Sequence, residues 1–401
     1  MTETRLLSRN LLQIFNRYLE VGGEEAWVVN LEKSFDLPTC YFESADWVGP
    51  NAPPKWSQAF RMIYNPVSLE KLRQVHRRER AEAWIIHNAF PTGSAAIYHE
   101  AQTNGLPLIQ YIHNFRPIAV SGYLNASDLP NFPSRMRTHL TEIRRGSWQN
   151  SHLKTAWFAT VLATARLLGW FNGITAWIAV SEFMRDQFIR AGVPPERIFT
   201  LRHFWRPSAD IPPDTSGSHY LFLGRLVEAK GILVLLDVWD LIWADRKHSG
   251  PRLVICGDGP LRETIQSREA ANPLVDFKGI TSGEAKRRLL SSARAIIAPS
   301  VCLESLGLMA YESYEFTKPV LASRAGGLGE IVMHNQTGLL HEPGDVATLY
   351  EQVMTLESEP AKRIDLGRNG REWLRENADE RRWLRKFNEI VEFAIATSRN
   401  Y

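Results

Sequence analysis

Two patterns of apolar positions alternate along the first half of the chain. Short apolar runs bounded by Gly, Pro, Asn or His predict buried β-strands, and longer segments with apolar residues three to four positions apart predict helices. Strands are expected at 11–15, 40–42, 83–87, 106–113 and 176–180, and helices from 24 onward and at 68–79, 93–103 and 182–190. This alternation is typical of a parallel sheet that helices cover on both faces.

The second half repeats the pattern after a segment with the composition of a linker. Residues 204–218 carry three prolines and several small polar residues, which favours an inter-domain connection. Strands are then expected at 220–223, 252–256, 275–277, 294–298 and 320–323, and helices at 231–243, 261–268 and 282–290. The prediction is therefore an α/β protein with two doubly wound Rossmann-like domains, 1–207 and 208–379. A last helix, predicted from 380 to 396 within a segment of about 380–401, is expected to pack back on the first domain.

One apolar stretch, 155–180, needs to be tested as a membrane span. Arg166 interrupts it, and the longest run without a charge, 167–181, has 15 residues. A span needs about 20, so a core helix followed by a strand is the better interpretation. The preceding segment, 121–153, is expected to be irregular.

Composition excludes several classes of protein. Hydrophobic residues make up 44% and charged residues 23%, which is typical of a globular protein, and a net charge of +3 does not favour a nucleic-acid partner. The three cysteines are widely scattered, so neither a metal site nor a disulfide framework is predicted. The first residues lack the apolar region of a secretory signal. We expect a cytoplasmic protein in a reducing compartment.

A basic and aromatic segment, 135–177, has two interpretations. Its Arg and Lys residues and its aromatic residues could contact an anionic membrane or a lipid-linked acceptor, which would place the protein at the inner face of the membrane. The alternative is a solvated helix face with a buried apolar side. The sequence leaves both open.

Two carboxylates in the second half of the chain are the main candidates for a functional site. Glu304 and Glu312 lie eight positions apart. Glu304 is expected in the loop after the strand predicted at 294–298, and the short apolar run between the two carboxylates is expected to begin a helix. Eight residues of helix span about 12 Å, and Glu312 is expected about two turns down that helix. Free backbone N–H groups at the start of a helix bind phosphate well. Here they would belong to Leu306, Gly307 and Leu308. Ligand hydroxyls are the expected partners of the two carboxylates, with salt bridges to Lys or Arg as the alternative.

Further polar groups follow neighbouring strands in the same half. Arg225 and Lys230 bracket the start of the helix after the first strand, and two cations there suit a diphosphate. Gly257 opens a tight turn, 257–260, which is either a simple connection or a ligand contact. Gly338 and the turn 343–345 are expected to be structural turns.

The first half offers weaker candidates at strand ends. Gly22 and Gly23 lie between a strand and a helix, where an anion could bind, although most such pairs are plain turns. His87 and His113 each end a strand, and ligands of open α/β sheets bind beyond the carboxyl ends of strands.

Several short motifs together resemble one enzyme family. They are GRLVEAKG at 224–231, GDGP at 257–260, FKG at 277–279, the Glu304/Glu312 pair, PV-A-S at 319–323, GGLGE at 326–330 and TGLLHEPGD at 337–345. The combination is similar to the retaining glycosyltransferases of family 4, which have the two-domain B-type fold. The first half matches more loosely, through NRYLEVGGEE, HNAFP, HNFRP and VSEF.

The resemblance implies a function and roles for individual residues. Such an enzyme moves a sugar from a nucleotide-diphosphate-sugar, here of the UDP or GDP type, to a glycan, lipid-linked or small-molecule acceptor, without a bound metal or other cofactor. Arg225 and Lys230 are implied to hold the diphosphate. Glu312 is implied to bind the ribose, and Glu304 the transferred sugar.

The same resemblance assigns acceptor-side roles. The Gly22–Gly23 loop is implied to close over the phosphates and acceptor, and His113 to lie near the sugar. The candidate catalytic residues are therefore Glu304, His113, Arg225 and Lys230. The candidate donor-binding residues are Gly22, Gly23, Arg225, Lys230, Gly257, Leu306, Gly307, Leu308 and Glu312.

Two other classes of function remain open at this point. A nucleotide-sugar epimerase or hydrolase of the same fold would consume the donor without an acceptor. A non-catalytic scaffold that binds sugar nucleotides would be expected to lack one of four charged residues, all of which are present: Arg225, Lys230, Glu304 and Glu312. Synthesis of a cell-surface polysaccharide or glycoconjugate is the leading hypothesis.

Overall fold

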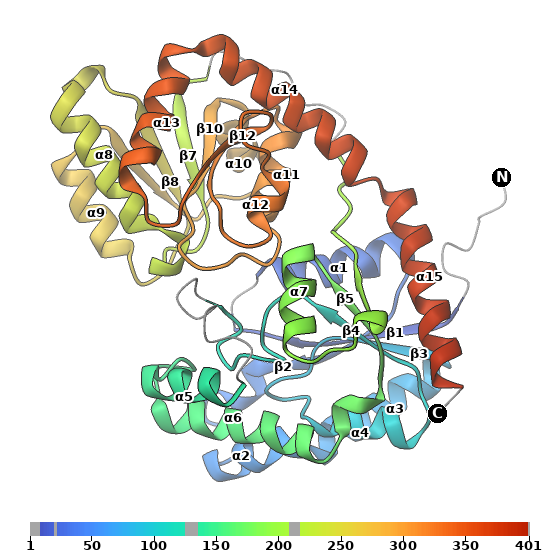
Figure 1. Ribbon diagram of the computed structural model, residues 1–401. Helices are drawn as coiled ribbons and strands as arrows, with labels where there is room; N and C mark the ends of the chain where they lie inside the picture. The colour runs from blue at the N-terminus through green and yellow to red at the C-terminus, as the bar shows by residue number, and fades with distance from the viewer. Residues whose placement is uncertain (1–8, 20–21, 125–134, 208–216, 400–401) are drawn as a thin grey trace. The chain divides into compact units, whose positions relative to one another are not determined.

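The computed structural model describes residues 9–19, 22–124, 135–207 and 217–399. They form two compact units (Figure 1). Unit 1 contains the described residues between 9 and 123, those between 135 and 203, and 381–399. Unit 2 contains Leu124 and the described residues between 204 and 380.

Unit 1 is built on six parallel strands in the order β2-β1-β3-β4-β5-β6. The strands are β1 Leu11–Arg17, β2 Thr39–Glu43, β3 Ala83–Asn88, β4 Leu108–Ile112, β5 Ile174–Ala179 and β6 Ile198–Thr200. The helices are α1 Gly23–Phe35, α2 Lys55–Ile63, α3 Pro66–Glu79, α4 Ala96–Thr103, α5 Arg135–Arg145, α6 His152–Leu167 and α7 Glu182–Arg190. Short 3-10 helices lie at Ser44–Trp47, Trp170–Gly173 and Pro195–Arg197. Every residue of β3, β4 and β5 is buried, as expected for central strands covered on both faces.

Unit 2 has a second sheet of six parallel strands, in the order β12-β11-β10-β7-β8-β9. The strands are β7 His219–Leu223, β8 Arg252–Cys256, β9 Val275–Gly279, β10 Ala293–Ala298, β11 Val320–Ser323 and β12 Gly338–His341. The helices are α8 Ile232–Arg246, α9 Arg262–Ala271, α10 Gly283–Ser291, α11 Leu308–Glu315, α12 Leu328–Ile331, α13 Val346–Ser358 and α14 Pro360–Asn377. Short 3-10 helices lie at Glu228–Lys230 and Lys247–Ser249.

Side chains from successive positions of one strand enter different cores in unit 2. Tyr220 and Phe222 of β7 join a cluster with α8 and α13, whereas Leu221, between them, packs with Leu290 of α10 and Phe316. Side chains of a strand alternate between the two faces of its sheet, so both faces are covered by helices. The helices on both faces hold the sheet, and polar loops follow the ends of its strands.

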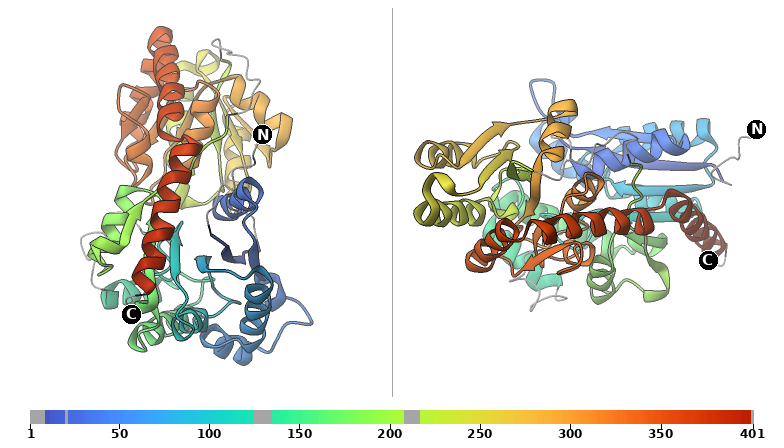
Figure 2. Two further views of the ribbon diagram at one scale, coloured as in Figure 1. Left: turned by 90° about the vertical axis from the view of Figure 1, so that its right-hand side faces the viewer. Right: turned by 90° about the horizontal axis from the view of Figure 1, so that it is seen from above.

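The last helix, α15 Glu380–Ser398, completes unit 1 rather than unit 2 (red in Figures 1 and 2). Its Trp383 stacks on Phe35 of α1, with ring centroids 5.5 Å apart. Farther along, Phe393 meets Phe199 of β6, and Glu392 pairs with Arg9 at 2.7 Å. Trp383 is buried, and fully burying a large apolar side chain contributes about 1.5–3 kcal/mol, so this residue contributes most to holding the helix on unit 1.

The predicted architecture is confirmed, and some local predictions are wrong. Two parallel sheets are present, and α15 packs on the first half of the chain as expected. Residues 121–153 are not irregular throughout, because α5 lies within them, and their residues 125–134 lie outside the described part. Gly338 begins strand β12 instead of forming a turn. The stretch 155–180 is a helix followed by a strand, as predicted.

Candidate functional site

The strand order of unit 2 reverses between β7 and β10, which lie side by side. Ligands of open α/β sheets bind beyond the carboxyl ends of strands at such a reversal. The loop after β7 carries Arg225 and Lys230, and the loop after β10 carries Glu304. Three of the predicted site residues therefore come from the two loops that flank the reversal.

Backbone contacts join these two loops closely. The N–H groups of Val301 and Cys302 both donate to the carbonyl of Ala229, at 3.0 and 3.1 Å. Gly231 has a φ of +71°, and a Cβ there would lie 1.8 Å from the carbonyl oxygen of Pro299. A side chain cannot fit in that space, so glycine at 231 is required for the loops to approach.

Lys230 and Glu304, predicted separately, form an ion pair. Lys230 Nζ lies 2.6 Å from Glu304 Oε1, and the Ser300 hydroxyl donates to the same oxygen. Burial alone would raise the pKa of Glu304, but the charge and hydrogen bond of Lys230, the Ser300 hydroxyl and the charge of Arg225 outweigh it. The pKa of Glu304 therefore lies below its ordinary value, and the side chain is a carboxylate at neutral pH.

Glu312 also has a lysine partner, Lys286 of α10, at 2.8 Å. The salt bridges considered as the alternative are thus present at both carboxylates. Lys286 was not predicted, because a lysine on an amphipathic helix carries no signal of its own in the sequence. The expectation that Glu312 lies two turns down a helix is wrong, since α11 begins at Leu308 and Glu312 is its fifth residue.

The start of α11 presents backbone donors. Gly307, with a φ of +94°, precedes the helix, and a Cβ there would lie 2.6 Å from the side chain of Leu328. Within the described part of the chain, no acceptor is found for the N–H groups of Leu306, Gly307 and Leu308. These are the groups predicted to meet a diphosphate, and they follow the Glu304 loop directly.

Gly257 has a structural reason to be glycine. Its φ is +145°, and a Cβ would lie 1.8 Å from the carbonyl oxygen of Gly224. The next residue, Asp258, accepts a hydrogen bond from Leu226 N at 2.9 Å through its carbonyl. The 257–260 turn therefore holds the loop that carries Arg225 through close backbone contacts. These contacts explain the GDGP motif without any ligand contact.

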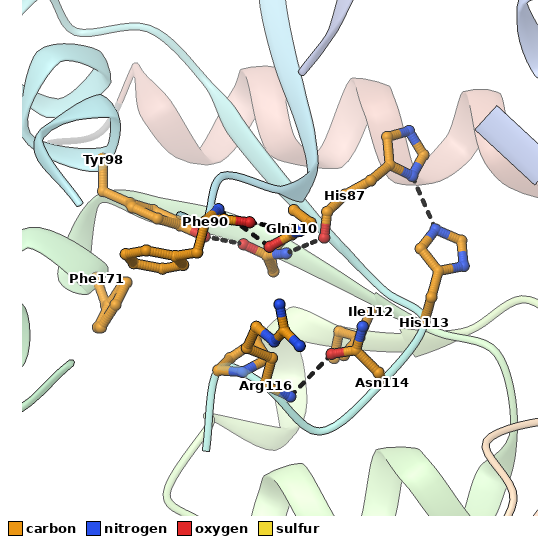
Figure 3. A pocket seen from close by; sticks show the side chains of 11 residues that line it. His87, Phe90, Tyr98, Gln110, Ile112, His113, Asn114, Arg116 and Phe171 are labelled. Carbon is orange, nitrogen blue, oxygen red and sulfur yellow. Dashed lines mark hydrogen bonds between the residues drawn. The ribbon is translucent and has the colours of Figure 1, made fainter. Parts of the chain in front are cut away.

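In unit 1 the strand order reverses between β1 and β3, and a small cavity lies nearby (Figure 3). Its volume is about 10 Å³, which is room for about one water. Among its lining residues are His87, His113, Asn114 and Arg116, all at the ends of β3 and β4. Gly22 and Gly23, at the start of α1, are exposed, and a Cβ at Gly22 would meet nothing within 4 Å.

A chain of hydrogen bonds fixes the protonation of the two histidines. Gln13 directs its NH₂ group to Thr39 Oγ1 and two carbonyls, so its oxygen faces His87 Nε2 at 2.8 Å. His87 Nε2 must then carry the proton. Burial lowers the pKa of both histidines, that of His113 to about 3, so both rings are neutral at neutral pH. We assigned the tautomers from this network.

The proton on His87 Nε2 determines the tautomer of His113. With a proton on its Nε2, neutral His87 offers Nδ1 as an acceptor, and His113 Nε2 donates to it at 2.8 Å (Figure 3). His113 Nδ1 is therefore a bare acceptor, and it has no partner among the described residues. A ligand hydroxyl could donate to it, which suits the predicted position near a sugar or acceptor.

Glu24, in the first turn of α1, is a half-buried residue whose carboxyl group the sequence did not single out. Its Oε2 accepts hydrogen bonds from the Tyr18 hydroxyl at 3.2 Å and Asn114 Nδ2 at 2.9 Å. Its Oε1 is buried without a partner in the described part of the chain. Burial raises the pKa of Glu24 to about 7, although Arg116 acts in the opposite direction.

We expect Glu24→Gln to change how stability depends on pH. Because the pKa of Glu24 is raised on folding from 4.5 to about 7, the folded protein binds the proton more tightly between these values. The free energy of unfolding then falls by up to about 3 kcal/mol as pH rises through that window. Glu24→Gln should remove this fall, so that its stability relative to the parent increases from pH 5 to pH 8 in urea unfolding. Glu263→Gln, an exposed first-turn carboxyl of α9, is the control; an equal pH profile for Glu24→Gln and the parent would contradict the assignment.

No three His, Cys, Asp or Glu side chains in the described ranges gather closely enough to hold a metal ion. None of the described helices is both long and apolar enough to cross a membrane.

Family models match both halves of the chain. Residues 206–373 match the model for glycosyl transferases group 1, and residues 36–204 match the model for glycosyltransferase family 4. The D-inositol 3-phosphate glycosyltransferase of Pseudarthrobacter chlorophenolicus is 26% identical over 314 residues, which cover 75% of this chain and 69% of that protein. The sulfoquinovosyl transferase of Arabidopsis thaliana is 31% identical over 155 residues, 38% of this chain and 29% of that protein.

Solved structures share the fold. Anabaena HepE, in complex with UDP, superposes with a TM-score of 0.65 at 17% sequence identity and covers 97% of this chain and 100% of its own. The lipopolysaccharide outer core galactosyltransferase WaaB gives a TM-score of 0.63 at 14% identity, with 95% and 99% covered. The architecture is thus GT-B-like, and the two matching family models together span most of the sequence. The chain belongs to glycosyltransferase family 4, also described as glycosyl transferases group 1.

Proposed function

We propose that this protein is a retaining glycosyltransferase that moves a sugar from a nucleotide-diphosphate-sugar to a glycan, lipid-linked or small-molecule acceptor. The observation that carries the proposal is the Lys230–Glu304 pair at the strand reversal of unit 2, beside the N–H groups that begin α11. Synthesis of a cell-surface polysaccharide or glycoconjugate is the proposed context. UDP is the proposed nucleotide of the donor, because the HepE structures contain UDP and UDP-glucose.

Each charged group of unit 2 receives a role in binding the donor. Arg225, Lys230 and the N–H groups of 306–308 would neutralise the diphosphate as it leaves. Glu304 would accept hydrogen bonds from hydroxyls of the transferred sugar, exchanging part of its contact with Lys230 for them. Glu312 would bind the ribose hydroxyls, beside Lys286. Gly257 would act by shaping the Arg225 loop.

Unit 1 would hold the acceptor. His113 Nδ1 would accept a hydrogen bond from a hydroxyl of the sugar or acceptor, and the Gly22–Gly23 loop would contact the phosphates and acceptor. In the reaction, the bond between the sugar anomeric carbon and the phosphate oxygen breaks, and the acceptor oxygen attacks from the same face. The leaving phosphate takes the proton of the acceptor hydroxyl. The protein then contributes positioning and electrostatic stabilisation.

Nucleotide binding provides the test. A ligand that binds only the folded protein at a hundred times its dissociation constant adds about 2.7 kcal/mol of stability. We expect UDP, compared with GDP and ADP in thermal unfolding, to raise the melting temperature by several degrees, and Lys230→Ala to lose that shift. Lys278→Ala, whose lysine pairs with Asp276 elsewhere in unit 2, should keep it. The absence of a shift with all three nucleotides would refute the proposed donor site.

We also propose that unit 1 contacts an anionic membrane through a surface on α2 and α6. Trp56 and Phe60 of α2 are 70% and 64% exposed, one helical turn apart. The Phe60 ring contacts Trp157 of α6, and Leu153, one turn before Trp157, is 82% exposed. Exposed Lys154 adds positive charge, a combination typical of interfacial helices.

Vesicle binding tests this surface. The protein should sediment with vesicles that contain phosphatidylglycerol more than with pure phosphatidylcholine vesicles, and salt should weaken the binding. The double variant Trp56→Ser/Leu153→Ser should lose most of it. Leu241→Ser, which removes an exposed leucine of unit 2, is the matched control. If the double variant sediments like the parent protein, this surface does not contact the membrane.

A further inference from the structure

A second cavity in unit 1, of about 140 Å³, is larger than the one near His113. It lies beyond the end of β2, and its walls come from the 3-10 helix Ser44–Trp47, from α2 and from the start of α3. By the measure that gives the His113 cavity room for about one water, this cavity has room for roughly ten, on the scale of one sugar ring. None of the candidate residues named so far lines it.

The groups that line this cavity balance in charge. Two are acidic, Glu43 and Asp46, and two are basic, Arg61 and Lys71. An anion such as phosphate would meet two carboxylates as well as two cations. A neutral ligand with many hydroxyls can instead donate to the carboxylates and accept from the cations at the same time. The buried Trp47 and Phe42 add the apolar wall on which the carbon face of a sugar ring would pack.

Several of these polar groups are available for a ligand. Glu43 pairs with Arg17 at 3.2 Å, and Lys71 Nζ donates to the Tyr41 carbonyl at 2.7 Å. The side chains of Asp46 and Arg61, in contrast, make no ion pair or hydrogen bond within the described residues. Asn65 is 3% exposed, and its NH₂ group donates to Ser68 Oγ and to the Thr92 carbonyl, at 2.8 and 2.7 Å. A carbonyl only accepts, so this orientation of the amide is fixed. Asn65 Oδ1 is then left as a buried acceptor without a partner in the described part of the chain.

One segment of chain separates the two cavities of unit 1. Asn88, the last residue of β3, and Phe90 line the cavity near His113, and Thr92 lines the second cavity. Asn16, at the end of β1, holds this segment: its Oδ1 accepts from the Thr92 N–H at 2.8 Å, and its Nδ2 donates to Ser44 Oγ at 2.8 Å. The two cavities are therefore neighbours along the carboxyl edge of one sheet, with a fixed wall between them.

From this arrangement we infer that the second cavity binds a neutral sugar residue of the acceptor, so that the acceptor is a glycan of at least two sugar residues. The residue that receives the new sugar would lie at the His113 side, and its neighbour in the glycan would occupy the cavity lined by Asp46, Arg61 and Asn65. This inference rests on the proposed function, since it assigns the acceptor of that same reaction. It narrows the acceptor from a glycan, a lipid or a small molecule to an oligosaccharide or a polymer.

Titration calorimetry and saturation-transfer NMR on the full chain test the inference. The probes are glucose, N-acetylglucosamine, maltose and chitobiose, with inorganic phosphate as an anion. We expect at least one neutral saccharide to bind, with a disaccharide tighter than its monosaccharide. Arg61→Gln and Asp46→Asn should each weaken that binding about tenfold, the effect of one hydrogen bond to a charged group. Arg77→Gln, which removes an exposed arginine paired with Glu70 on α3, should leave it unchanged.

Three results would overturn the inference: no binding by any of the saccharides, equal binding by the parent and both cavity variants, or binding of phosphate in place of saccharides. Both variant positions are at or near the surface, so loss of folding should not confuse the result. UDP-induced thermal shifts on the same samples separate this inference from the proposed function. If UDP raises the melting temperature but the substitutions at Arg61 and Asp46 leave saccharide binding unchanged, the inference alone is refuted. Saccharide binding that depends on them, without a shift by any nucleotide, refutes the proposed donor site instead.

Discussion

Replacing Lys230 by alanine should lower kcat/KM for sugar transfer by about a hundredfold or more. The reason is that the ammonium group would no longer stabilise the charge that develops on the leaving diphosphate, and loss of one such donor typically costs 10²–10³ in rate. A second effect should accompany the first. Glu304 would lose the partner at 2.6 Å while its own side chain is only 15% exposed, and breaking a buried ion pair costs about 3–5 kcal/mol. Because Lys230 is 26% exposed, we expect about 2 kcal/mol in urea unfolding.

A second substitution separates the two effects. Adding Glu304→Gln to Lys230→Ala removes the unpaired charge, so the double variant should regain most of the lost stability. It should regain no activity, because neither charged group is then present to act on the donor. Lys278→Ala, which breaks an ion pair away from these loops, should change transfer little. Near-parental turnover by Lys230→Ala would show that the phosphate site lies elsewhere.

Replacing Gly231 by alanine should destabilise unit 2 by about 4 kcal/mol or more, beyond what most single substitutions cause. A Cβ at 231 would lie 1.8 Å from the Pro299 carbonyl oxygen, at a φ of +71°. Neither the loop after β7 nor the loop after β10 can move without breaking the hydrogen bonds that 301 and 302 donate to Ala229. Relieving the collision would therefore require breaking these hydrogen bonds.

Gly279→Ala provides the matched control for this prediction. Gly279 has a similar φ of +66°, but a Cβ there would meet nothing within 4 Å. It should cost about 1–2 kcal/mol, the strain of a left-handed residue with a side chain. Urea unfolding of the two variants then isolates the collision from the strain. Equal destabilisation of both would mean that the 231 loop relaxes and that the close approach to Pro299 is dispensable.

The sequence predicted best the elements that a local pattern defines. The bounds of β8, β11 and α7 agree with the predicted ones, because each is an apolar or amphipathic run with clear limits. Strands β6 and β12, each three or four residues at a sheet edge, were missed because so short a run carries no period. Helices α2 and α5 were missed because charged or exposed aromatic residues occupy much of their length.

The candidate site was predictable as a set of residues but not as a set of contacts. Arg225, Lys230 and Glu304 follow strands that end at one edge, which the topology alone suggests. That Lys230 pairs with Glu304, or Lys286 with Glu312, depends on residues far apart in sequence. The start of α11 was misplaced because the positive φ of Gly307 keeps the helix from beginning before Leu308. The protonation of His113 follows from Gln13, a hundred residues earlier, through His87.

The position of α15 has a consequence for how the protein folds during synthesis. All the described residues of unit 2 precede 381, so this unit is complete as soon as they have left the ribosome. Unit 1 begins first in sequence but must wait for the last helix, because Trp27 and Phe35 of α1 pack against Trp383. Until then an aromatic surface of unit 1 stays uncovered. The unit translated first is thus the unit finished last, and a chain released short of α15 would offer that surface to chaperones.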